Sequence, residues 1–573
     1  MKNLFKKIFN IVPSNWNSKI FTILLLTLFN AVFELIGIGL LIPLLTVFTE
    51  NGNTNFSNFE IFNTLSDQEK ILSILIVFII VYILKNFFFV LFQQKKINFS
   101  HDLATNLSQN LHSNYLKKNY IFFTLKNSSQ ILRNIIDECN IFSFGVIISV
   151  INLLSDTVIF ISIFIFLLIY NPIVSLVSTL TALLIGFIII FTQQVKLKTW
   201  GAKRQYHSEK RIKLIQETYG NIKEIIISNT KNFFLDQFYK HTSENAFAGK
   251  KKDFYYILPK SILEVIAVIM IFILVYILMI SNYDFQEILI TMGVLSMATI
   301  KIIPSIANII KSIQGLKFNT PVVNLIHSEL NESFNDNYQN NLNNKNSKKL
   351  NFKKIVLKDI NYNYPNNSLK VLEDINLTIN KGDKIGIVGE TGSGKTTLIN
   401  LLVGLINPTK GEIMIDGANL QSTINDWHNK IAYISQDTFL ADESIIFNIS
   451  IKDIGKKIDI EKINKIIKLL SLDSLISSLK DGLNTNVGEK GVKLSGGQIQ
   501  RIGIARAIYG NPEVLFLDEA TNALDEKTKD MILKNIYNFY EDRTLITIAH
   551  DKETLDFCQK IYTIRNKKLE IVR

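Results

Sequence analysis

The sequence predicts a multidomain chain in which an all-α bundle of six transmembrane helices precedes an α/β domain of the P-loop class. Three observations lead to this fold class: six long apolar windows, an abrupt change of composition after them, and a glycine-rich motif between a strand-like and a helix-like run. The 573 residues are 47% hydrophobic and only 20% charged, which excludes a disordered chain or a nucleic-acid scaffold.

Residues 1–330 are predicted to form the transmembrane domain. A spanning helix needs about 20 mostly apolar residues, and six windows meet this requirement, near residues 20–48, 71–93, 144–170, 172–192, 257–281 and 286–314. The loops 94–143 and 193–256 contain six and thirteen Lys or Arg residues. The loops 50–70, 171–172 and 282–285 contain one between them, Lys70. Because cytoplasmic loops are enriched in Lys and Arg, both termini are predicted to be cytoplasmic. Helical apolar spacing in the basic loops predicts that the membrane helices continue into the cytoplasm.

A linker is predicted over residues 331–349, which contain eight Asn residues and little apolar content. The second domain is predicted over residues 350–573. Its strand-like runs Lys384–Val388 and Val514–Leu517 alternate with helix-like stretches, which is the pattern of an α/β domain.

The segment Gly389–Thr396 matches the P-loop pattern and opens a helix-like run. Its glycines let backbone N–H groups curve around the β- and γ-phosphates of a nucleotide, and the helix N-terminus adds a positive dipole. Lys395 is expected to pair with the phosphates and Thr396 to ligate Mg²⁺. The predicted ATP-binding residues of this segment are Gly389, Glu390, Thr391, Gly392, Ser393, Gly394, Lys395, Thr396 and Thr397.

Two carboxylates, Asp518 and Glu519, follow the apolar run Val514–Leu517. Ligands of open α/β sheets bind at the carboxyl ends of the strands. Asp518 is expected to hold Mg²⁺, directly or through water, and Glu519 to polarise the attacking water as general base. A carboxylate pair at a strand end is by itself often a helix cap, but its place downstream of the P-loop indicates a Walker B element.

The pentapeptide Leu494–Gln498 lies between these two elements and reads Leu-Ser-Gly-Gly-Gln. With it the chain resembles the ABC transporter superfamily over nearly its whole length. The resemblance implies that the signature acts in trans, with Ser495 and the adjacent amides at the γ-phosphate held by the P-loop of a second subunit. The signature residues are Leu494, Ser495, Gly496, Gly497 and Gln498.

The same resemblance implies roles for four further residues. Tyr364 resembles the aromatic residue on which adenine stacks, and Gln436 resembles the Q-loop glutamine at the Mg²⁺ site. Asp525 ends a D-loop that opens with Asn522, where Ser is common. His550 resembles the switch histidine that contacts the γ-phosphate, although Asp-Lys follows it instead of the frequent Arg-Leu. The expected cofactors are ATP and Mg²⁺, and the expected catalytic residues are Glu519, His550 and Gln436.

A membrane domain followed by one nucleotide-binding domain resembles the exporter half-transporters of this superfamily. Two ATP sites, each shared between a P-loop and a signature, require two copies, so the resemblance implies a homodimer with twelve spans. It further implies a multi-pass protein of the bacterial inner membrane with a cytoplasmic ATP-binding domain and no nucleic-acid partner. Coupling helices are expected near Phe122–Ile131 and Glu217–Ile227, where plain surface helices are the alternative.

Ionisable residues at bilayer depth are costly and often functional. Lys85, Lys260 and Lys301, on three predicted spans, are expected to converge on a water-filled cavity for an anionic head group such as pyrophosphate. Each lysine has a structural alternative; Lys260 can pair with Glu264 one helical turn away.

The substrate expectation comes from a second resemblance. The segments Phe33–Pro43, Phe56–Leu65 and Lys301–Ser305 resemble PglK-type flippases, which move lipid-linked oligosaccharides on a polyprenyl pyrophosphate carrier. The expected function is therefore ATP-driven flipping of such a lipid, with membrane lipid or lipid-linked saccharide as partner. The alternatives are a lipid A or phospholipid flippase, a peptide exporter, and a membrane regulator that binds ATP without pumping.

Overall fold

The computed structural model describes residues 2–40, 67–170, 172–280, 285–331, 351–365, 369–549 and 552–573. Its contacts divide the chain into two units, residues 1–118 with 125–335 and residues 119–124 with 336–573. Within the described residues the first unit is helical, and the second carries all the strands. This arrangement confirms the predicted fold class.

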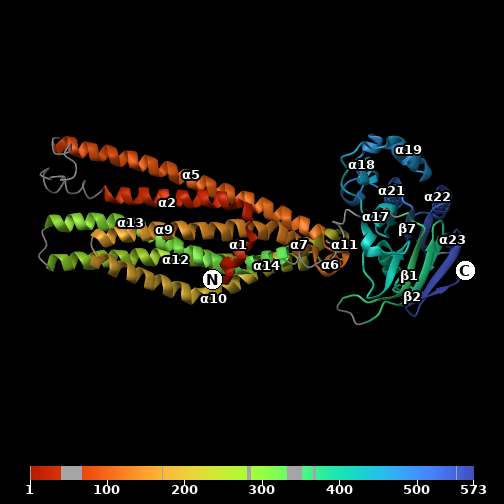
Figure 1. Cartoon of the computed structure of the whole chain (residues 1–573), viewed down its shortest axis with the longest axis horizontal. Helices are drawn as coiled ribbons and strands as arrows, with labels where there is room; N and C mark the ends of the chain where they lie inside the picture. The colour runs from red at the N-terminus through yellow and green to blue at the C-terminus, as the bar shows by residue number, and fades with distance from the viewer. Residues whose placement is uncertain are drawn as a thin grey trace. The chain divides into compact units, whose positions relative to one another are not determined.

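Long helices that run side by side dominate the first unit (Figure 1). Three of them, α5, α10 and α12, are 50, 49 and 50 residues long. At 1.5 Å per residue such a helix measures roughly 75 Å, more than twice the thickness of the hydrocarbon core. The helices therefore extend well beyond a bilayer, as the apolar spacing of the basic loops predicted. The helices are α1 (Lys2–Ile11), α2 (Asn17–Gly39), α5 (Asp67–Leu116), α7 (Ser128–Arg133), α8 (Cys139–Ile141), α9 (Ile148–Tyr170), α10 (Pro172–Gly220), α11 (Ile222–Ile227), α12 (Lys231–Ile280), α13 (Phe285–Phe318) and α14 (Thr320–Asn331).

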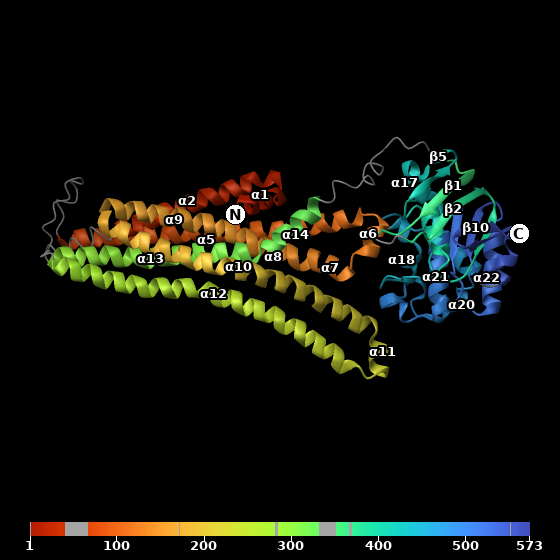
Figure 2. The same ribbon diagram turned by 90° about the horizontal axis from the view of Figure 1, so that it is seen from below.

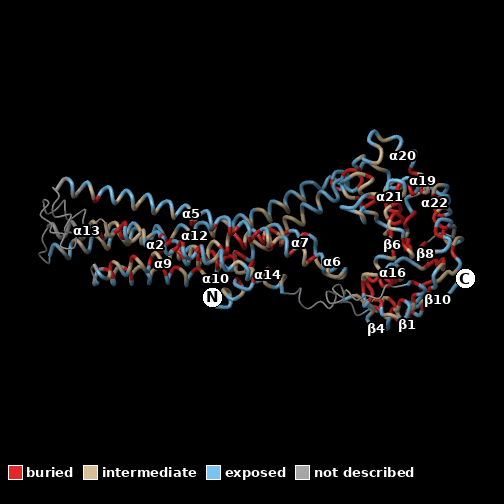
Figure 3. The backbone as a smooth tube through the Cα atoms, turned by 45° about the horizontal axis from the view of Figure 1, so that its top comes forward, coloured by how far each residue is buried: buried red, intermediate tan, exposed pale blue. Residues whose placement is uncertain are grey.

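Six helical stretches of the described residues are long and apolar enough to cross a membrane. Each overlaps one predicted window, in the same order, which confirms six candidate spans. Many of their large apolar side chains are exposed, as expected for helices that face lipid. Figure 3 colours much of the long helices as exposed. The end of the first predicted span and the segment Phe56–Leu65 lie outside the described residues. The stretches are Ser14–Gly39, Leu72–Leu116, Ser128–Ile169, Thr179–Gly220, Lys231–Ile277 and Met292–Phe318.

Short helices lie where the sequence predicts coupling segments. α6 (Tyr120–Leu125) and α7 cover most of the first segment. α11 joins α10 to α12, and these two long helices pack along one another (Figure 2). The coupling role of these short helices stays a prediction.

Buried ion pairs tie α10 to the end of α7 and to the residues that follow it. Glu138, which is fully buried, lies 3.0 Å from Arg204 Nη2. Arg133 Nη1 lies 2.7 Å from Glu209 Oε2. Residues Asn134–Glu138 and Phe142–Ile147 are π-helical, and such wider turns change the direction of the side chains they carry. Because a buried charge without a partner is costly, these pairs specify how α10 packs here.

The second unit contains two sheets. A four-stranded antiparallel sheet has the order β2-β1-β4-β5, and a six-stranded sheet has the order β10-β9-β3-β8-β7-β6. In the larger sheet β3 pairs in parallel with β8 and β9, and β7 with β6 and β8. The carboxyl ends of β3, β7 and β8 therefore meet at one edge. The strands are β1 (Lys354–Tyr362), β2 (Leu372–Asn380), β3 (Lys384–Val388), β4 (Lys410–Ile415), β5 (Ala418–Asn419), β6 (Ile431–Ile434), β7 (Val514–Asp518), β8 (Thr544–Ile548), β9 (Lys560–Arg565) and β10 (Lys568–Ile571).

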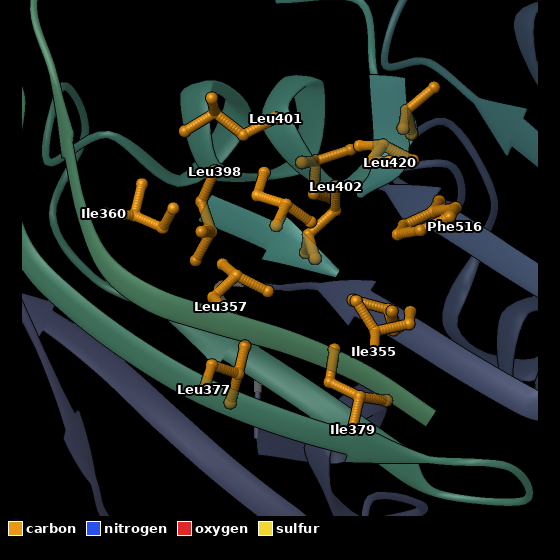
Figure 4. Packing of buried hydrophobic residues seen from close by; sticks show 14 of the residues in the cluster. Ile355, Leu357, Ile360, Leu377, Ile379, Leu398, Leu401, Leu402, Leu420 and Phe516 are labelled. Atoms are coloured by element: carbon orange, nitrogen blue, oxygen red, sulfur yellow. The ribbon is translucent and has the colours of Figure 1, made fainter. Parts of the chain in front are cut away.

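The apolar core of this unit joins both sheets to the helix that follows the P-loop. Leu398, Leu401 and Leu402 of that helix belong to one buried cluster with Leu357 and Ile360 of β1 (Figure 4). All five residues of β7 are buried, which fits a central strand covered on both faces. Besides α6, the helices of this unit are α16 (Lys395–Val403), α17 (Ile424–Lys430), α18 (Ile445–Ile449), α19 (Ile460–Leu469), α20 (Asp473–Ser478), α21 (Gly496–Tyr509), α22 (Glu526–Phe539) and α23 (Lys552–Asp556).

Trp427→Ala is expected to lower the free energy of unfolding of this unit by about 3–5 kcal/mol. Trp427 is fully buried, its ring centroid lies 5.6 Å from that of Phe352, and its Nε1 donates to the Leu402 carbonyl oxygen over 2.9 Å. The substitution leaves a cavity and a carbonyl without its donor. Urea-dependent labelling of Cys558, which is 2% exposed, measures the change in a Cys139→Ser background.

Phe439→Ala is the matched control for this prediction. Phe439 belongs to the same unit but is 65% exposed, so its truncation is expected to change the free energy of unfolding by less than about 0.5 kcal/mol. Equal shifts for the two variants would contradict the placement of Trp427 in the core.

Candidate nucleotide-binding site

The P-loop connects β3 to α16, and its backbone conformation requires glycine. Gly389, Gly392 and Gly394 have φ angles of 151°, 82° and 107°, which residues with a Cβ rarely adopt. A Cβ on Gly389 would lie 2.7 Å from Ser393 Oγ and 3.0 Å from the Ile564 carbonyl oxygen. The loop therefore curves closely over the N-terminus of α16, as the sequence motif predicts.

Lys395 is 6% exposed, and its Nζ donates to the carbonyl oxygens of Gly389 and Glu390 over 2.7 and 3.0 Å. Burial lowers the pKa of Lys395, and two carboxylates at the end of β7 oppose this shift. Ser393 Oγ is buried and has no hydrogen-bond partner among the described residues. Phosphate oxygens are acceptors for both groups, so this loop fits the phosphates of a nucleotide.

Asp518 ends β7 and is 5% exposed. The Tyr433 hydroxyl donates to Asp518 Oδ2 over 3.1 Å, and the Thr396 hydroxyl also hydrogen-bonds to this carboxyl group. Burial raises the pKa of Asp518, while the hydrogen bond from Tyr433 and the charge of Lys395 lower it. A carboxylate beside a threonine hydroxyl supplies oxygen ligands of the kind that Mg²⁺ uses together with phosphates. The two predicted ligands Thr396 and Asp518 therefore lie together.

Glu519 follows Asp518 in the left-handed region, with φ of 50°, which is uncommon for a residue with a side chain. Gln436 Nε2 donates to Glu519 Oε2 over 2.9 Å, and Asn522 Nδ2 donates to the same oxygen over 3.0 Å. The structure thus brings together two of the three predicted catalytic residues. The third, His550, lies outside the described residues.

Asn522 and Tyr433 are contacts that the sequence analysis did not assign. The side chain of Asn522 donates a hydrogen bond to the carboxylate of Glu519. Asn522 stands where Ser is common in the D-loop, and its side chain places the donor further from the backbone than a serine hydroxyl. Its position three residues after Glu519 is the only sequence signal for that contact. Tyr433 reaches Asp518 because β6 pairs with β7, which the sequence alone does not reveal.

Tyr364 lies next to α16. Its hydroxyl is 3.2 Å from Thr397 Oγ1, and its ring meets that of Tyr362 edge to face at 5.1 Å between centroids. These contacts fix an aromatic ring beside the P-loop helix. Adenine stacking on Tyr364 stays a prediction.

The signature pentapeptide forms the N-terminus of α21. Ser495 Oγ accepts a hydrogen bond from the Gln498 amide over 3.3 Å, and Gln498 Oε1 accepts one from the Ser495 amide over 2.8 Å, which completes a capping box. A Cβ on Gly497 would lie 3.1 Å from the Ala523 carbonyl oxygen. The signature and the D-loop are therefore in close contact, and a helix N-terminus with glycine amides is suited to a phosphate.

Asp525 is the N-cap of α22, and its Oδ2 accepts a hydrogen bond from the Thr528 amide over 3.1 Å. Hydrogen bonds from Thr528 lower the pKa of Asp525. Gln500 of α21 accepts a hydrogen bond from the Ala523 amide over 3.0 Å. Hydrogen bonds thus link the D-loop to the signature helix as well as to Glu519.

The three lysines predicted to form a substrate cavity do not converge. Lys85 and Lys301 both pair with Glu34, and the Lys301 Nζ lies 3.2 Å from Glu34 Oε1. Lys260 pairs instead with Glu264 of its own helix over 3.7 Å, and both side chains are more than half exposed. The expectation of one cavity with three lysines is therefore wrong for Lys260, because this side chain lies on an exposed helix face.

The fold and this site define a membrane protein with a P-loop ATP-binding domain. Residues 20–300 match the ABC transporter transmembrane region, and residues 372–522 match the ABC transporter domain. Together these matches cover most of the chain. The chain belongs to the ABC transporter superfamily, with the exporter-type order of a transmembrane domain followed by an ABC domain.

Many curated relatives match part of the chain, among them the following three. The alpha-hemolysin translocation ATP-binding protein HlyB of Escherichia coli is 40% identical over 216 residues, which are 38% of this chain and 30% of HlyB. The ABC transporter B family member 29, chloroplastic, of Arabidopsis thaliana is 38% identical over 217 residues, 38% of this chain and 34% of that protein. The toxin RTX-I translocation ATP-binding protein of Actinobacillus pleuropneumoniae is 39% identical over 216 residues, 38% of this chain and 30% of that protein. The matched region thus spans about a third of these relatives.

A solved structure extends the likeness to both units. The structure of a bacterial Atm1-family ABC exporter with ATP bound matches 97% of this chain and 94% of its own chain, with a TM-score of 0.76 and 19% sequence identity. This similarity shows a common fold.

Proposed function

We propose that this protein is an ATP-driven exporter that works as a homodimer in the bacterial inner membrane, with its ABC domains in the cytoplasm. The observation that carries the proposal is the cluster of Lys395, Asp518, Glu519 and Gln436 at the carboxyl edge of the large sheet, on a chain with six candidate spans. The chain holds one P-loop and one signature, so two copies supply two shared sites. The Atm1-family likeness supports this proposal, because that protein is an exporter with ATP bound.

The residues of the chain have distinct roles in the proposed reaction. The P-loop amides and Lys395 bind the β- and γ-phosphates, and Ser495 with the adjacent amides of the partner's signature closes over the γ-phosphate. Thr396, Asp518 and Gln436 hold Mg²⁺, which supplies charge neutralisation on the phosphates when bound. Glu519, held by Gln436 and Asn522, accepts the proton of the attacking water.

The proposed coupling uses the short helices α6, α7 and α11. Closure of the two ABC domains around ATP moves these helices, and the long helices α5, α10 and α12 carry the movement to the spans. Hydrolysis with the help of Glu519 then resets the cycle.

The proposed substrate is a lipid-linked oligosaccharide on a polyprenyl pyrophosphate carrier. The support for it is the resemblance of Phe33–Pro43 and Lys301–Ser305 to PglK-type flippases. A polypeptide is the second candidate, because HlyB and the RTX-I protein are named toxin translocation proteins. That similarity extends over 38% of this chain, so it ranks below the lipid substrate.

Substrate-stimulated ATP hydrolysis tests whether a lipid-linked oligosaccharide or a polypeptide is the substrate. The full chain in nanodiscs is expected to hydrolyse ATP faster with a polyprenyl diphosphate saccharide than with lipid A, a phospholipid or an unfolded polypeptide. Stimulation by the polypeptide alone would contradict the lipid substrate. ATP hydrolysis that responds to none of the four, while no transport occurs, would instead support a regulator that does not pump.

A further inference from the structure

A cavity of about 510 Å³ with a mixed polar and apolar lining lies in the first unit. It is lined by residues of α2, α5, α9, α12 and α13, of the segment before α9, and by Asn319 between α13 and α14. Its charged lining residues are Lys96, Lys252, Lys311 and Asp156, so lysines exceed carboxylates by two. Asparagines contribute to the same wall. Since charged and amide groups are rare among membrane helices unless they have a function, this cavity is a candidate binding site.

Two of these lysines lack a carboxylate partner. Lys96 is 8% exposed, and its Nζ donates to Asn152 Oδ1 over 3.1 Å. The Lys311 Nζ lies 5.8 Å from the ring centroid of Tyr256. Neither forms an ion pair with any described residue, whereas Lys252 lies 3.3 Å from the carboxylate of the adjacent Asp253. Asp156 of the same wall attracts Lys96 electrostatically without forming an ion pair with it. Two ammonium groups therefore line the cavity without a carboxylate in contact, which favours an anionic ligand.

An unsatisfied acceptor completes the cavity. Asn30 is 6% exposed and lines the cavity, and its Oδ1 has no hydrogen-bond partner among the described residues. A buried amide oxygen without a donor costs free energy, so a ligand with hydroxyl or amide N–H groups is favoured beside the anion.

The position of the cavity along the spans suits a head group from the cytoplasmic side. Lys96 follows the predicted window 71–93, Lys252 precedes the window 257–281, and Lys311 lies at the end of the window 286–314. The distribution of Lys and Arg predicts that these ends of the windows are cytoplasmic. The three lysines of the wall are therefore expected to lie toward the inner surface of the membrane, where lipid phosphate groups are found.

We propose that this cavity binds a hydroxyl-bearing head group of phosphate or diphosphate type. Lys96 and Lys311 donate to the phosphate oxygens, and Asn30 accepts from a hydroxyl of the ligand. The inference rests on the proposed function, for which the cavity is the loading site, and it replaces the three-lysine cavity expected from the sequence. Lys85 and Lys301 both pair with the carboxylate of Glu34 and so join their helices to α2.

Binding of radiolabelled farnesyl diphosphate tests the proposal with the full chain in phosphatidylcholine nanodiscs, without nucleotide. Lys96→Met and Lys311→Met are each expected to weaken binding about tenfold, because each removes a charged hydrogen bond. Asp156→Asn is expected to strengthen binding several-fold, because it removes the one carboxylate of the wall. Lys260→Met is the matched control, since this membrane-helix lysine is exposed and paired with Glu264.

Lys96→Met is expected to weaken binding and Asp156→Asn to strengthen it, and these opposite effects separate a binding role from a structural role. Equal weakening by Lys96→Met and Asp156→Asn would show damage to the fold and overturn the proposal, as would unchanged binding in both lysine variants. A single symmetric size-exclusion peak and a thermal unfolding midpoint like that of the wild type confirm that each variant is folded. Farnesol that competes as well as farnesyl diphosphate would also overturn the proposal, because farnesol carries no phosphate.

Competition by inorganic pyrophosphate identifies the source of the anion. If inorganic pyrophosphate competes at concentrations similar to those of unlabelled farnesyl diphosphate, the site binds a soluble diphosphate. If pyrophosphate competes much more weakly, the site binds a lipid-linked diphosphate. Both outcomes support a diphosphate site. Because the assay contains no ATP, it is independent of pumping. Lysine-dependent binding without ATP-driven transport would refute the proposed function alone, and transport with lysine-independent binding would refute the cavity alone.

Discussion

Glu519→Gln is expected to lower ATP turnover by about 10²- to 10⁴-fold while ATP binding remains, because general base catalysis contributes about this much. The amide keeps the size of the side chain and still offers an acceptor to Gln436, which lies 2.9 Å from Glu519 Oε2. It cannot accept the proton of the attacking water. Release of inorganic phosphate measures turnover, and a fluorescent ATP analogue measures binding.

Glu513→Gln is the control for this prediction, since Glu513 immediately precedes β7 whereas Glu519 follows it. Its carboxylate pairs with Lys430 and lies 3.6 Å from Lys381, so its loss affects surface ion pairs and is expected to leave turnover within about twofold of wild type. Turnover by Glu519→Gln at near the wild-type rate would refute the assignment of the general base.

A dimer of two chains linked in tandem is expected to lose ATP turnover by at least about 10²-fold when Lys395→Ala and Ser495→Arg are placed in the same half. If each ATP site uses the P-loop of one chain and the signature of the other, this placement damages both sites. The same two substitutions split between the halves leave one site intact. The split dimer is therefore expected to keep turnover within several-fold of wild type.

The split arrangement is its own matched control, because both tandem dimers contain the same two substitutions. The reverse result, with turnover lost only in the split dimer, would show that P-loop and signature of one chain form the site. Loss in both arrangements, with the dimer still folded and able to bind ATP, would show that one intact site is insufficient for turnover and would contradict the expected rate.

Much of the ATP-binding domain follows from local sequence. Glycines with positive φ and a lysine at the start of α16 are imposed by the backbone conformation of the P-loop, so its motif of eight residues predicts them. The carboxylate at the end of β7 follows from the buried apolar run before it. The six candidate spans follow from window hydropathy in the same way. Tyr433 depends on the pairing of β6 with β7, which no local pattern contains.

The interior of the membrane unit was less predictable. Periodicity reports which residues share a helix face, but it does not report which faces meet. The pairing of Lys85 and Lys301 with one carboxylate, Glu34, depends on how α2, α5 and α13 pack. Lys260 illustrates the same limit, since its apolar neighbours suggest burial whereas its side chain is exposed. Lys96 lies just outside the predicted span, so a search confined to the apolar windows does not include it.

The central claim is that ATP hydrolysis by this chain drives a lipid-linked substrate across a membrane. The most direct test is ATP-dependent translocation in proteoliposomes that contain the purified full-length protein, with a fluorescent polyprenyl diphosphate oligosaccharide and a labelled phospholipid as alternative substrates. Glu519→Gln protein serves as the blank. Movement of the saccharide lipid with wild-type protein and ATP, and none with the blank, is the expected result. Movement of neither lipid while ATP hydrolysis proceeds at its normal rate would contradict the claim.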